Sequence, residues 1–348
     1  MQIGTTEISR DGRPFIIAEI GVNHDGDVAR GKALIDAART AGADAVKFQL
    51  FDAELLLSAE AGLVSYQKAS ANSAHDLLAA LQLSAAQMGE LVGHAKSVGL
   101  AAIVTPFSVA LVKPCVEMGV DGLKLASPDL VNRPLVEEAM KTKLPTILST
   151  GQATLDEVKA TLGWVGSAAA RMAFLHCVSS YPTRPEDATL AAITVLRNRW
   201  PQMCVGYSDH TLGVMTGALA VAAGACVLEK HFTHDRAAKG PDHAASLEAP
   251  AFAEYARLAR EAYLLRGAYE KKPRGVEVET RLQTRQSLCA VRDLAAGTVL
   301  AAEMLATKRP GTGIPAGEIT AVVGKTLVRA VPAGALLNAG DLGQKQGK

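Results

Sequence analysis

The sequence of 348 residues predicts a (β/α)₈ barrel followed by a small domain of short strands. Eight short runs of apolar or β-branched residues alternate with segments whose apolar residues recur at helical spacing. Nearly every run ends in a polar or ionisable residue, and in barrel enzymes the strand ends carry the reactive groups. The alternation stops after residue 267, where the composition changes. A doubly wound open sheet is the alternative fold for the same alternation.

The predicted strands are separated by segments with the pattern of amphipathic helices. The patterns at 27–42 and 84–99, for example, place apolar residues on one face. A last helix near 249–267 would close the eighth unit, and about 250 residues is the usual length of such a barrel. The strands are expected at 15–20, 45–50, 101–107, 122–126, 145–150, 172–178, 204–209 and 226–232.

Local signals mark two helix starts and one long loop. Ser84 with Gln87, and Thr154 with Glu157, have the spacing of capping boxes. The stretch 51–80 exceeds the usual loop length and follows the second strand, on the side where barrels place substrate loops. We therefore expect an active-site loop with some helix there.

The change in composition after residue 267 predicts a domain boundary. We assign residues 1–267 to the barrel and the charged stretch 268–285 to an exposed linker. Residues 286–348 carry turns rich in glycine and proline between short apolar runs, which is typical of a compact domain of short strands. Such a domain is too small to perform the chemistry alone.

The composition indicates a soluble cytoplasmic protein. Lysine and arginine total 36 against 35 acidic residues, so no overall field favours nucleic acid or a membrane surface, and neither is expected as a partner. The first residues lack an apolar signal region, and no run reaches the roughly 18 apolar residues of a spanning helix. The five cysteines are odd in number and widely spaced, which predicts buried free thiols.

Two lysines stand inside strands whose faces should be buried. Lys47 lies in AVKFQ and Lys124 in GLKLA. An unpaired buried ammonium is costly, so both need anions. If they converge at the barrel mouth they would bind phosphate and carboxylate, with Ser127 and Ser149 adding hydrogen bonds. The alternative is that each forms an internal salt bridge.

Two histidines end neighbouring predicted strands and form a candidate metal site. His210 and His231 would lie a few ångströms apart, with Glu19, Asp242 or water completing the sphere. A partly open octahedron suits Mn²⁺ or Mg²⁺ better than tetrahedral zinc. The alternative is a pair of core histidines bonded to carbonyl groups.

Taken together, these runs resemble the sialic acid synthase family, which includes N-acetylneuraminate, legionaminic acid and pseudaminic acid synthases. TKRPGTGI (307–314) extends the resemblance to the antifreeze-like (SAF) domain that ends those enzymes. The signatures in the barrel are AEIGVNHDGD (18–27), AVKFQ (45–49), TPFS (105–108), LKLAS (123–127), ILSTG (147–151), LHCVSSYPT (175–183), GYSDHT (206–211), LEKHFT (228–233) and GPDHAASLE (240–248).

The resemblance implies a set of roles for these residues. His210 and His231 would hold the metal, usually Mn²⁺, with Glu19 and Asp242 beside it. Arg309 would reach from the partner subunit's antifreeze-like domain to the N-acyl group of the sugar, which implies a domain-swapped homodimer. Phosphoenolpyruvate would be gripped by Lys47, Lys124, Thr105, Ser127 and Ser149, with Gln49 and Tyr181 nearby.

The implied reaction condenses phosphoenolpyruvate with N-acetylmannosamine, giving N-acetylneuraminate and phosphate. Carbon 3 of phosphoenolpyruvate attacks the sugar aldehyde, whose carbonyl a metal ion can polarise. Glu19 or Asp242 would position or deprotonate the water that adds at carbon 2 before the C–O bond to phosphate breaks. Glu229 and Tyr181 complete the predicted catalytic set, together with Lys47 and Lys124.

Departures from the family pattern concern the acceptor sugar. Asp129 stands where bacterial neuraminate synthases usually have glutamate, and it should contact sugar hydroxyls. Val178 and Ser179 stand where threonine and asparagine are common, and we count Ser179 among the substrate-binding residues. N-acetylmannosamine is the default acceptor, and a diacetamido sugar, unacylated mannose or a 6-phosphosugar are the alternatives.

Two other classes of function remain open. The chain could be another metal-dependent barrel enzyme, such as an aldolase or an isomerase. It could also be a non-catalytic carbohydrate-binding protein, although intact Glu19, Lys47, Lys124, His210 and His231 argue against that.

Overall fold

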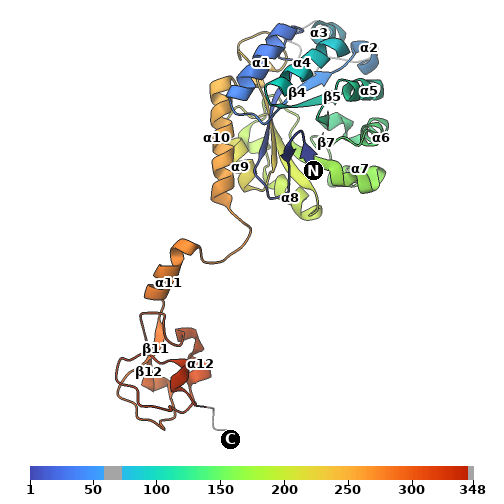
Figure 1. The fold of residues 1–348 in the computed structure, drawn as a ribbon. Helices are drawn as coiled ribbons and strands as arrows, with labels where there is room; N and C mark the ends of the chain where they lie inside the picture. The colour runs from blue at the N-terminus through green and yellow to red at the C-terminus, as the bar shows by residue number, and fades with distance from the viewer. Residues whose placement is uncertain (59–72, 344–348) are drawn as a thin grey trace. The chain divides into compact units, whose positions relative to one another are not determined.

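Eight parallel strands close into a barrel in the computed structural model of this chain, which describes residues 1–58 and 73–343 (Figure 1). β10 pairs with β9 on one side and with β3 on the other, which confirms the barrel and excludes the open sheet. The strands are β3 (Phe15–Gly21), β4 (Ala45–Leu50), β5 (Ala101–Pro106), β6 (Gly122–Leu125), β7 (Thr146–Ser149), β8 (Met172–Cys177), β9 (Cys204–Asp209) and β10 (Val227–His231).

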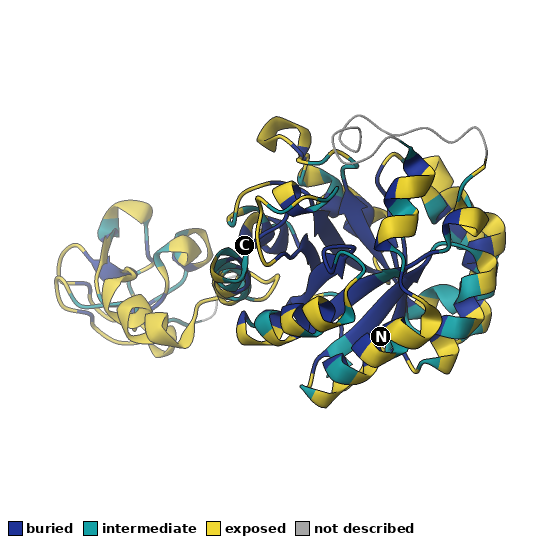
Figure 2. Ribbon diagram, turned by 90° about the horizontal axis from the view of Figure 1, so that it is seen from above, coloured by how far each residue is buried: buried dark blue, intermediate teal, exposed yellow. Residues whose placement is uncertain are grey.

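Helices surround the barrel, with exposed outer faces around the buried strands (Figure 2). The capping boxes predicted at Ser84 and Thr154 are both present, and each satisfies amide groups that a helix start leaves free. The helices of the barrel units are α1 (Val28–Thr40), α4 (Ala85–Ser97), α5 (Val109–Glu117), α6 (Arg133–Lys141), α7 (Leu155–Val165), α8 (Ala191–Arg199), α9 (Thr216–Ala222) and α10 (Ala249–Arg266).

The long loop predicted after β4 contains helix on both sides of the residues that lie outside the description. α2 (Ala53–Leu56) and α3 (Ala74–Leu81) are its helical parts. Both begin with a capping side chain, Asp52 and Ser73 respectively. The rest of that prediction falls on residues 59–72, outside the described part of the chain.

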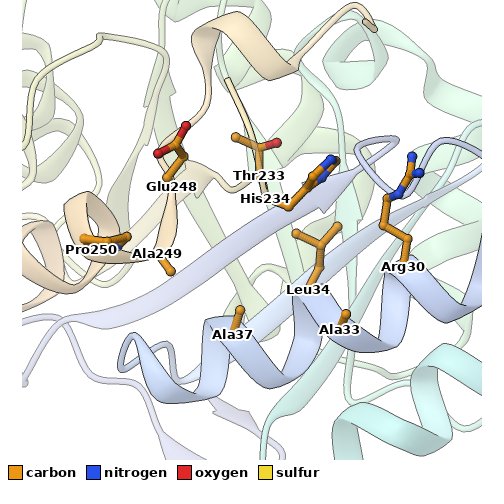
Figure 3. Close-up of a pocket in the computed structure, with 9 residues that line it drawn as sticks. All are labelled: Arg30, Ala33, Leu34, Ala37, Thr233, His234, Glu248, Ala249 and Pro250. Carbon is orange, nitrogen blue, oxygen red and sulfur yellow. The ribbon is translucent and has the colours of Figure 1, made fainter. Parts of the chain in front are cut away.

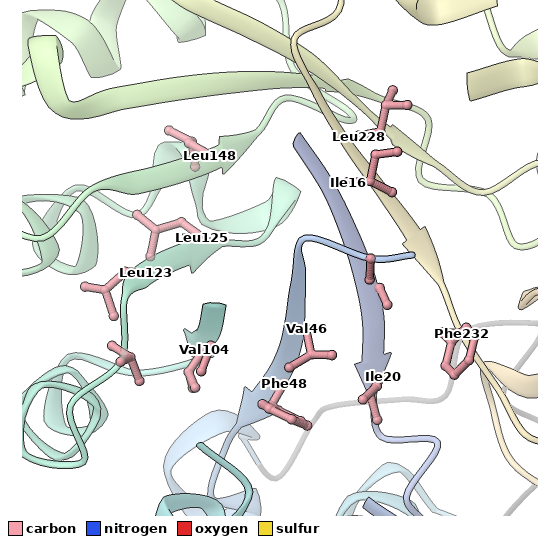
Figure 4. Close-up of a cluster of buried hydrophobic side chains, with 14 of the residues drawn as sticks. Ile16, Ile20, Val46, Phe48, Val104, Leu123, Leu125, Leu148, Leu228 and Phe232 are labelled. Atoms are coloured by element: carbon pink, nitrogen blue, oxygen red, sulfur yellow. The ribbon is translucent and has the colours of Figure 1, made fainter. Parts of the chain in front are cut away.

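Alternation along the strands builds two separate apolar layers. On β3, Ile16 and Ile20 point outward and join the large core between the strands and the helices (Figure 4). Phe15 and Ile17 point inward and belong to a second cluster. This cluster fills the barrel interior at the end where the strands begin, called the lower end below. The upper interior positions are therefore the ones left for polar side chains.

A short N-terminal hairpin covers the lower end of the barrel, and the sequence did not predict it. β1 (Gln2–Ile3) and β2 (Thr6–Glu7) are antiparallel. Ile3 and Ile8 are buried in the same cluster as the interior residues Phe15 and Ile17. This end of the barrel is thus closed by apolar side chains.

The chain divides into two compact units, Met1–Ala268 and Tyr269–Lys348. The second unit has its own apolar core, which includes Leu288 and Leu337. The stretch 268–285, expected to be a linker, contains α11 (Val278–Thr284). The remaining elements are β11 (Ser287–Ala290), β12 (Leu305–Lys308) and α12 (Ile319–Val322), and isolated bridges such as Cys289 to Leu336 extend the pairing.

All five cysteines are buried free thiols, as predicted. Among the residues that the structure describes, none of the helices combines the length and the apolar character needed to cross a bilayer.

Candidate active site

The polar residues at the upper end of the barrel interior come from the inward positions of the strands. On β3 and β4 these positions are Phe15, Ile17 and Glu19, then Ala45 and Lys47. On both strands the inward positions are apolar at the start and charged at the end, so the charged side chains gather on one side of the apolar cluster. This is the carboxyl end of the strands, where barrels bind substrates.

Glu19 is the centre of the first group of contacts. It lies opposite Lys47 in the strand register, and its Oε1 is 2.5 Å from the ammonium nitrogen of Lys47. The same oxygen accepts a hydrogen bond of 2.8 Å from Nε2 of Gln49. The other oxygen, Oε2, is buried without a hydrogen-bond partner among the described residues. Glu19 can therefore accept one more bond from a ligand.

Lys124 and Glu229 form the second group of contacts. The ammonium nitrogen of Lys124 is 3.6 Å from Oε1 of Glu229, which also accepts a 2.8 Å hydrogen bond from Ser208. Burial opposes the ionisation of Glu229, but the ammonium groups of Lys124 and Lys47 outweigh it and lower the pKa of this carboxyl. Both lysines thus have internal partners, the alternative left open by the sequence, and they also share one mouth.

The two predicted metal ligands lie side by side, with ring centres 5.4 Å apart. Nδ1 of His210 is 2.8 Å from the carbonyl oxygen of Val178, which can only accept, so Nδ1 carries a proton and the neutral ring has its lone pair on Nε2. Burial opposes the charged form of His210, but Cys177 and the carbonyl of Val178 outweigh it and raise its pKa. Nδ1 of His231 is buried without a hydrogen-bond partner among the described residues. Burial and the neighbouring cationic groups hold the pKa of His231 well below its usual range.

This arrangement fits a divalent ion that keeps some of its coordination positions free for other ligands. Neutral imidazole is the form that coordinates metals, and the lone pair of His210 and the unpartnered nitrogen of His231 supply it. No group of three or more histidine, cysteine, aspartate or glutamate residues with metal-binding geometry occurs within 1–58 and 73–343. Two nitrogen ligands would therefore leave the remaining positions to water and substrate oxygens.

Asp242 and Tyr181 border the histidine pair. Oδ2 of Asp242 is 3.5 Å from Nδ1 of His231, and burial raises the pKa of Asp242 above its ordinary value. The ring of Tyr181 packs against His210 with a centre-to-centre distance of 4.0 Å and meets His231 edge-on at 5.7 Å. The loops after β8 and β10 thus bring both predicted side chains to the histidines.

Several hydroxyl groups complete the rim. Thr105 Oγ1 and Ser149 Oγ are buried and have no hydrogen-bond partner among the residues described. Ser127 Oγ accepts a 3.0 Å bond from the amide of Gly151. A side chain at Gly151 would strike the hydroxyls of both Ser179 and Ser127, at 2.5 and 2.7 Å, so these two serines converge there. These groups offer donors to an oxygen-rich ligand.

Two other predicted site residues stand outside these contacts. Asp129 follows β6 in the 3₁₀ turn Ser127–Val131, where its Oδ1 accepts a 3.0 Å bond from Asn132 and burial raises its pKa. Arg309 directly follows β12 in the second unit and is exposed. The approach of Arg309 to a sugar therefore stays a prediction.

One inward residue was not among the predicted site residues, and three polar residues near the ends of strands face outward instead of into the mouth. Cys177 lies two residues after the inward-facing Leu175, so it also points inward, and its sulfur is 3.8 Å from Nδ1 of His210. His176 instead faces outward and bonds the carbonyl of Ala188. Asp209 and Lys230 pair with each other in the outer face of the wall. Strand parity is the signal that separates these two sets.

A separate surface pocket of about 290 Å³ lies between α1 and the start of α10 (Figure 3). Leu34 and Ala37 of α1 form its apolar floor, while Arg30, His234 and Glu248 supply its polar edge. None of the predicted site residues lines it. The pocket is therefore distinct from the barrel mouth.

Comparison with known proteins shows which families the chain matches. The model of the NeuB family matches residues 34–271, and the model of the SAF domain matches residues 285–343. The N,N'-diacetyllegionaminic acid synthase of Legionella pneumophila is 39% identical over 331 residues, which are 93% of this chain and 93% of that protein. The N-acetylneuraminate-9-phosphate synthase of Mus musculus is 33% identical over 317 residues, covering 90% and 88% of the two chains.

A solved structure has a similar fold. The crystal structure of N-acetylneuraminic acid (sialic acid) synthetase from Leptospira borgpetersenii, in complex with citrate, superposes with a TM-score of 0.74 at 32% identity. The match covers 80% of this chain and 94% of that one.

Proposed function

This chain belongs to the NeuB family, and from that premise we propose that it joins phosphoenolpyruvate to the aldehyde of an N-acylated hexosamine. The products would be a nine-carbon sugar acid and phosphate. The observation that carries the proposal is the barrel mouth, where Lys47 and Lys124 lie in one buried site with His210 and His231. An anion and an aldehyde oxygen could be held there together.

The lysines would bind the phosphate and the carboxylate of phosphoenolpyruvate. Each ammonium contacts a carboxylate, and Lys124 also donates to the carbonyl oxygen of Leu125. Because an ammonium has three donor positions, each lysine can still donate to an incoming anion. The unpartnered hydroxyls of Thr105 and Ser149 would add two donors, and Ser127 would add a third. Donors arranged before the ligand arrives stabilise developing charge without reorganising.

The histidines would hold Mn²⁺ or Mg²⁺, whose chemistry is to polarise the aldehyde carbonyl. The bond from His210 to the carbonyl of Val178 would keep Nε2 available as a ligand. Tyr181, packed on the His210 ring, would restrict its rotation. In the bond-forming step, carbon 3 of phosphoenolpyruvate attacks the aldehyde carbon, and the former carbonyl oxygen gains a proton and becomes a hydroxyl group.

Water must then add at carbon 2, and the C–O bond to phosphate must break. Asp242 is the better candidate to take the proton from that water, because burial raises its pKa and makes it a stronger base. Glu19 is bonded to Lys47 and Gln49 through one oxygen, which suits it to orient groups at the site. Glu229 would keep Lys124 charged and in place.

The acceptor predicted from the sequence is N-acetylmannosamine. A second candidate is an acceptor with two acetamido groups, because the relative with 39% identity is named for an N,N'-diacetyl product. Asp129, at the edge of the mouth, would contact hydroxyl groups of either sugar.

A phosphate-release assay tests the reaction. Phosphate should appear from phosphoenolpyruvate only when both Mn²⁺ and an acceptor are present, and the product mass identifies the sugar. The panel should contain N-acetylmannosamine, a diacetamido hexose, mannose and their 6-phosphates. Release without metal would favour a different barrel enzyme, and sugar binding without turnover would favour a carbohydrate-binding protein.

We also propose that the active enzyme is a homodimer in which Arg309 of one subunit serves the barrel of the other. Subunits carrying Arg309→Ala and subunits carrying His231→Ala should each be poorly active alone. After unfolding and refolding together, they should regain activity, because mixed dimers combine an intact barrel with an intact arginine. The absence of any gain, in a mixture shown to contain mixed dimers, would place Arg309 in its own barrel or outside the site.

A further inference from the structure

A buried ion pair stands in the barrel wall directly behind the two histidines. Asp209 and Lys230 lie opposite each other in the register of β9 and β10, one residue before His210 and His231 respectively. The ammonium nitrogen of Lys230 is 3.2 Å from Oδ1 of Asp209, and both side chains are 0% exposed. Their outward parity places them between the strands and the helices, away from the barrel interior.

Stability alone does not explain this pair. Removing two charges from water costs several kcal/mol per ion, and an apolar pair of similar size is often equally stable or more so. Oδ2 of Asp209 is also buried without a hydrogen-bond partner in the described part of the chain. The ring of Tyr255 lies 5.7 Å from the ammonium of Lys230, and the hydroxyl groups of Tyr255 and Tyr207 interact with the carboxylate of Asp209.

The bonds of the pair converge on one residue, Thr211. Oδ1 of Asp209 accepts from the amide of Thr211 at 2.8 Å and from its hydroxyl at 2.8 Å. Lys230 donates to the carbonyl oxygen of Thr211. The amide, the hydroxyl and the carbonyl of Thr211 are thus all held by the two charged side chains. Because Thr211 directly follows His210, the backbone on that side of the imidazole is fixed.

The other side of His210 is fixed from β8 and its loop. Its carbonyl accepts from the amide of Thr183 at 2.9 Å, and its ring bonds the carbonyl of Val178. The β8 loop holds the ring and the carbonyl of His210, and the ion pair holds the next residue, Thr211. Through Lys230, the pair also connects this backbone to the strand that ends in His231.

We propose that the Asp209–Lys230 pair is a positioning device, which holds His210 at the correct place relative to His231 for binding a divalent ion. This inference rests on the proposed metal site. The pair acts through Thr211 and touches neither the substrate nor the ion. Groups that orient metal ligands typically change metal affinity by about 10- to 100-fold when they are removed.

The test is the double variant Asp209→Asn/Lys230→Met, compared with the wild type. It removes both charges together, so neither partner is left buried and unpaired, and the asparagine oxygen can still accept from the amide of Thr211. Mn²⁺ binding should weaken at least about tenfold, measured by titration calorimetry, because the carbonyl of Thr211 loses its donor. The urea midpoint of the metal-free protein should not fall.

The control is Arg197→Met, which removes a buried guanidinium that bonds the exposed Asp11 and the carbonyl oxygen of Gly224. Both partners precede the first residues of β3 and β10, at the end of the barrel opposite the histidines. It should lower the urea midpoint and leave Mn²⁺ affinity unchanged. Should the double variant fail to fold, Thr211→Val removes the hydroxyl that bonds Asp209 and Thr216, and it should weaken Mn²⁺ binding in the same direction. Wild-type affinity in whichever of these variants folds would overturn the proposal.

Hydrogen exchange separates this inference from the metal assignment. In the metal-free protein, the peptide around Thr211 should exchange faster in the double variant than in the wild type, while Arg197→Met should leave its rate unchanged. If wild-type protein binds no Mn²⁺ through its histidines, the metal assignment fails, yet faster exchange would still show that the pair restrains this loop. Unchanged exchange would sink the positioning role itself.

Discussion

The two ends of the barrel interior are built from the same strands and have opposite chemistry. β3 begins with Phe15 inside the lower apolar cluster and ends with Glu19 at the mouth. β10 likewise begins with Val227 and ends with His231. The lower end is closed by Ile3 and other apolar residues of the N-terminal segment, whereas the upper end holds buried charges.

This difference shows how one set of strands separates stability from binding. The lower cluster removes apolar surface from water, which favours folding. At the mouth, oxygens of Glu19 and Glu229 and a nitrogen of His231 are buried without hydrogen-bond partners among the described residues. Such groups cost free energy until a ligand satisfies them. The lower end therefore offsets a cost that the upper end carries for binding.

The largest expected effect is on activity, from His231→Ala at the upper end. Removal of one of two proposed metal ligands should lower kcat/KM by more than about 100-fold, because even groups that only support a ligand typically account for 10- to 100-fold. Phosphate release measures this. His234→Ala changes an exposed imidazole three residues further on and should leave kcat/KM unchanged. Near-normal turnover in His231→Ala would remove the metal assignment.

The largest expected effect on stability comes from Phe15→Ala, at the other end of the same barrel. Truncation of a buried phenylalanine should cost about 3–5 kcal/mol of unfolding free energy, measured by urea denaturation. The folded fraction should keep its kcat/KM, because Phe15 lies below the mouth. A variant that stays stable but loses activity would show that the two ends are not independent.

Alternation explains most of what the sequence could predict about the mouth. Lys47 shares the parity of Ala45, and Glu19 that of Ile17, so an inward face with an apolar start and a charged end can be recognised from the strand alone. Parity would also have found Cys177. It was overlooked because a cysteine in an apolar run is more often a core residue.

Other features could not be predicted, for physical reasons. Lys230 and Lys47 look alike in sequence, since each lies in an apolar strand and is followed by a strand-end polar residue. Parity puts Lys230 on the opposite face from His231, but only the barrel shows that this face packs against helices and that Asp209 is there to pair with it. The N-terminal hairpin was missed because two-residue strands carry too little pattern, and their partner surface exists only after the barrel closes.

Acid should destabilise the upper end through His24, in the loop after β3. Burial, partly opposed by Asp25, lowers the pKa of His24 to about 4, and its Nδ1 accepts a 3.0 Å bond from the amide of Gly26. The unfolded chain takes up this proton near pH 6.5, so the contribution is complete above that pH and is lost as the pH falls towards 4. About 3 kcal/mol of unfolding free energy should disappear in that window.

Urea titrations between pH 7 and 4 measure this loss. His24→Asn is the matched variant, because its amide oxygen can accept from Gly26 and does not titrate. Its stability should fall less steeply over the same range. Equal slopes for the two proteins would assign the acid sensitivity to other groups.

The smallest expected effect on stability comes from Thr154→Ala, a residue at the upper end that should have no role in binding. Thr154 lies in the loop after β7, three residues beyond Gly151, and its hydroxyl accepts a 3.3 Å bond from the amide of Glu157 in the capping box of α7. Thr154→Ala should cost about 1 kcal/mol, because an amide at the helix start loses its partner. The kcat/KM should stay unchanged, since the side chain of Thr154 faces its own helix. A fall in kcat/KM comparable to that of His231→Ala would mean that the whole rim, and not only the inward positions, belongs to the site.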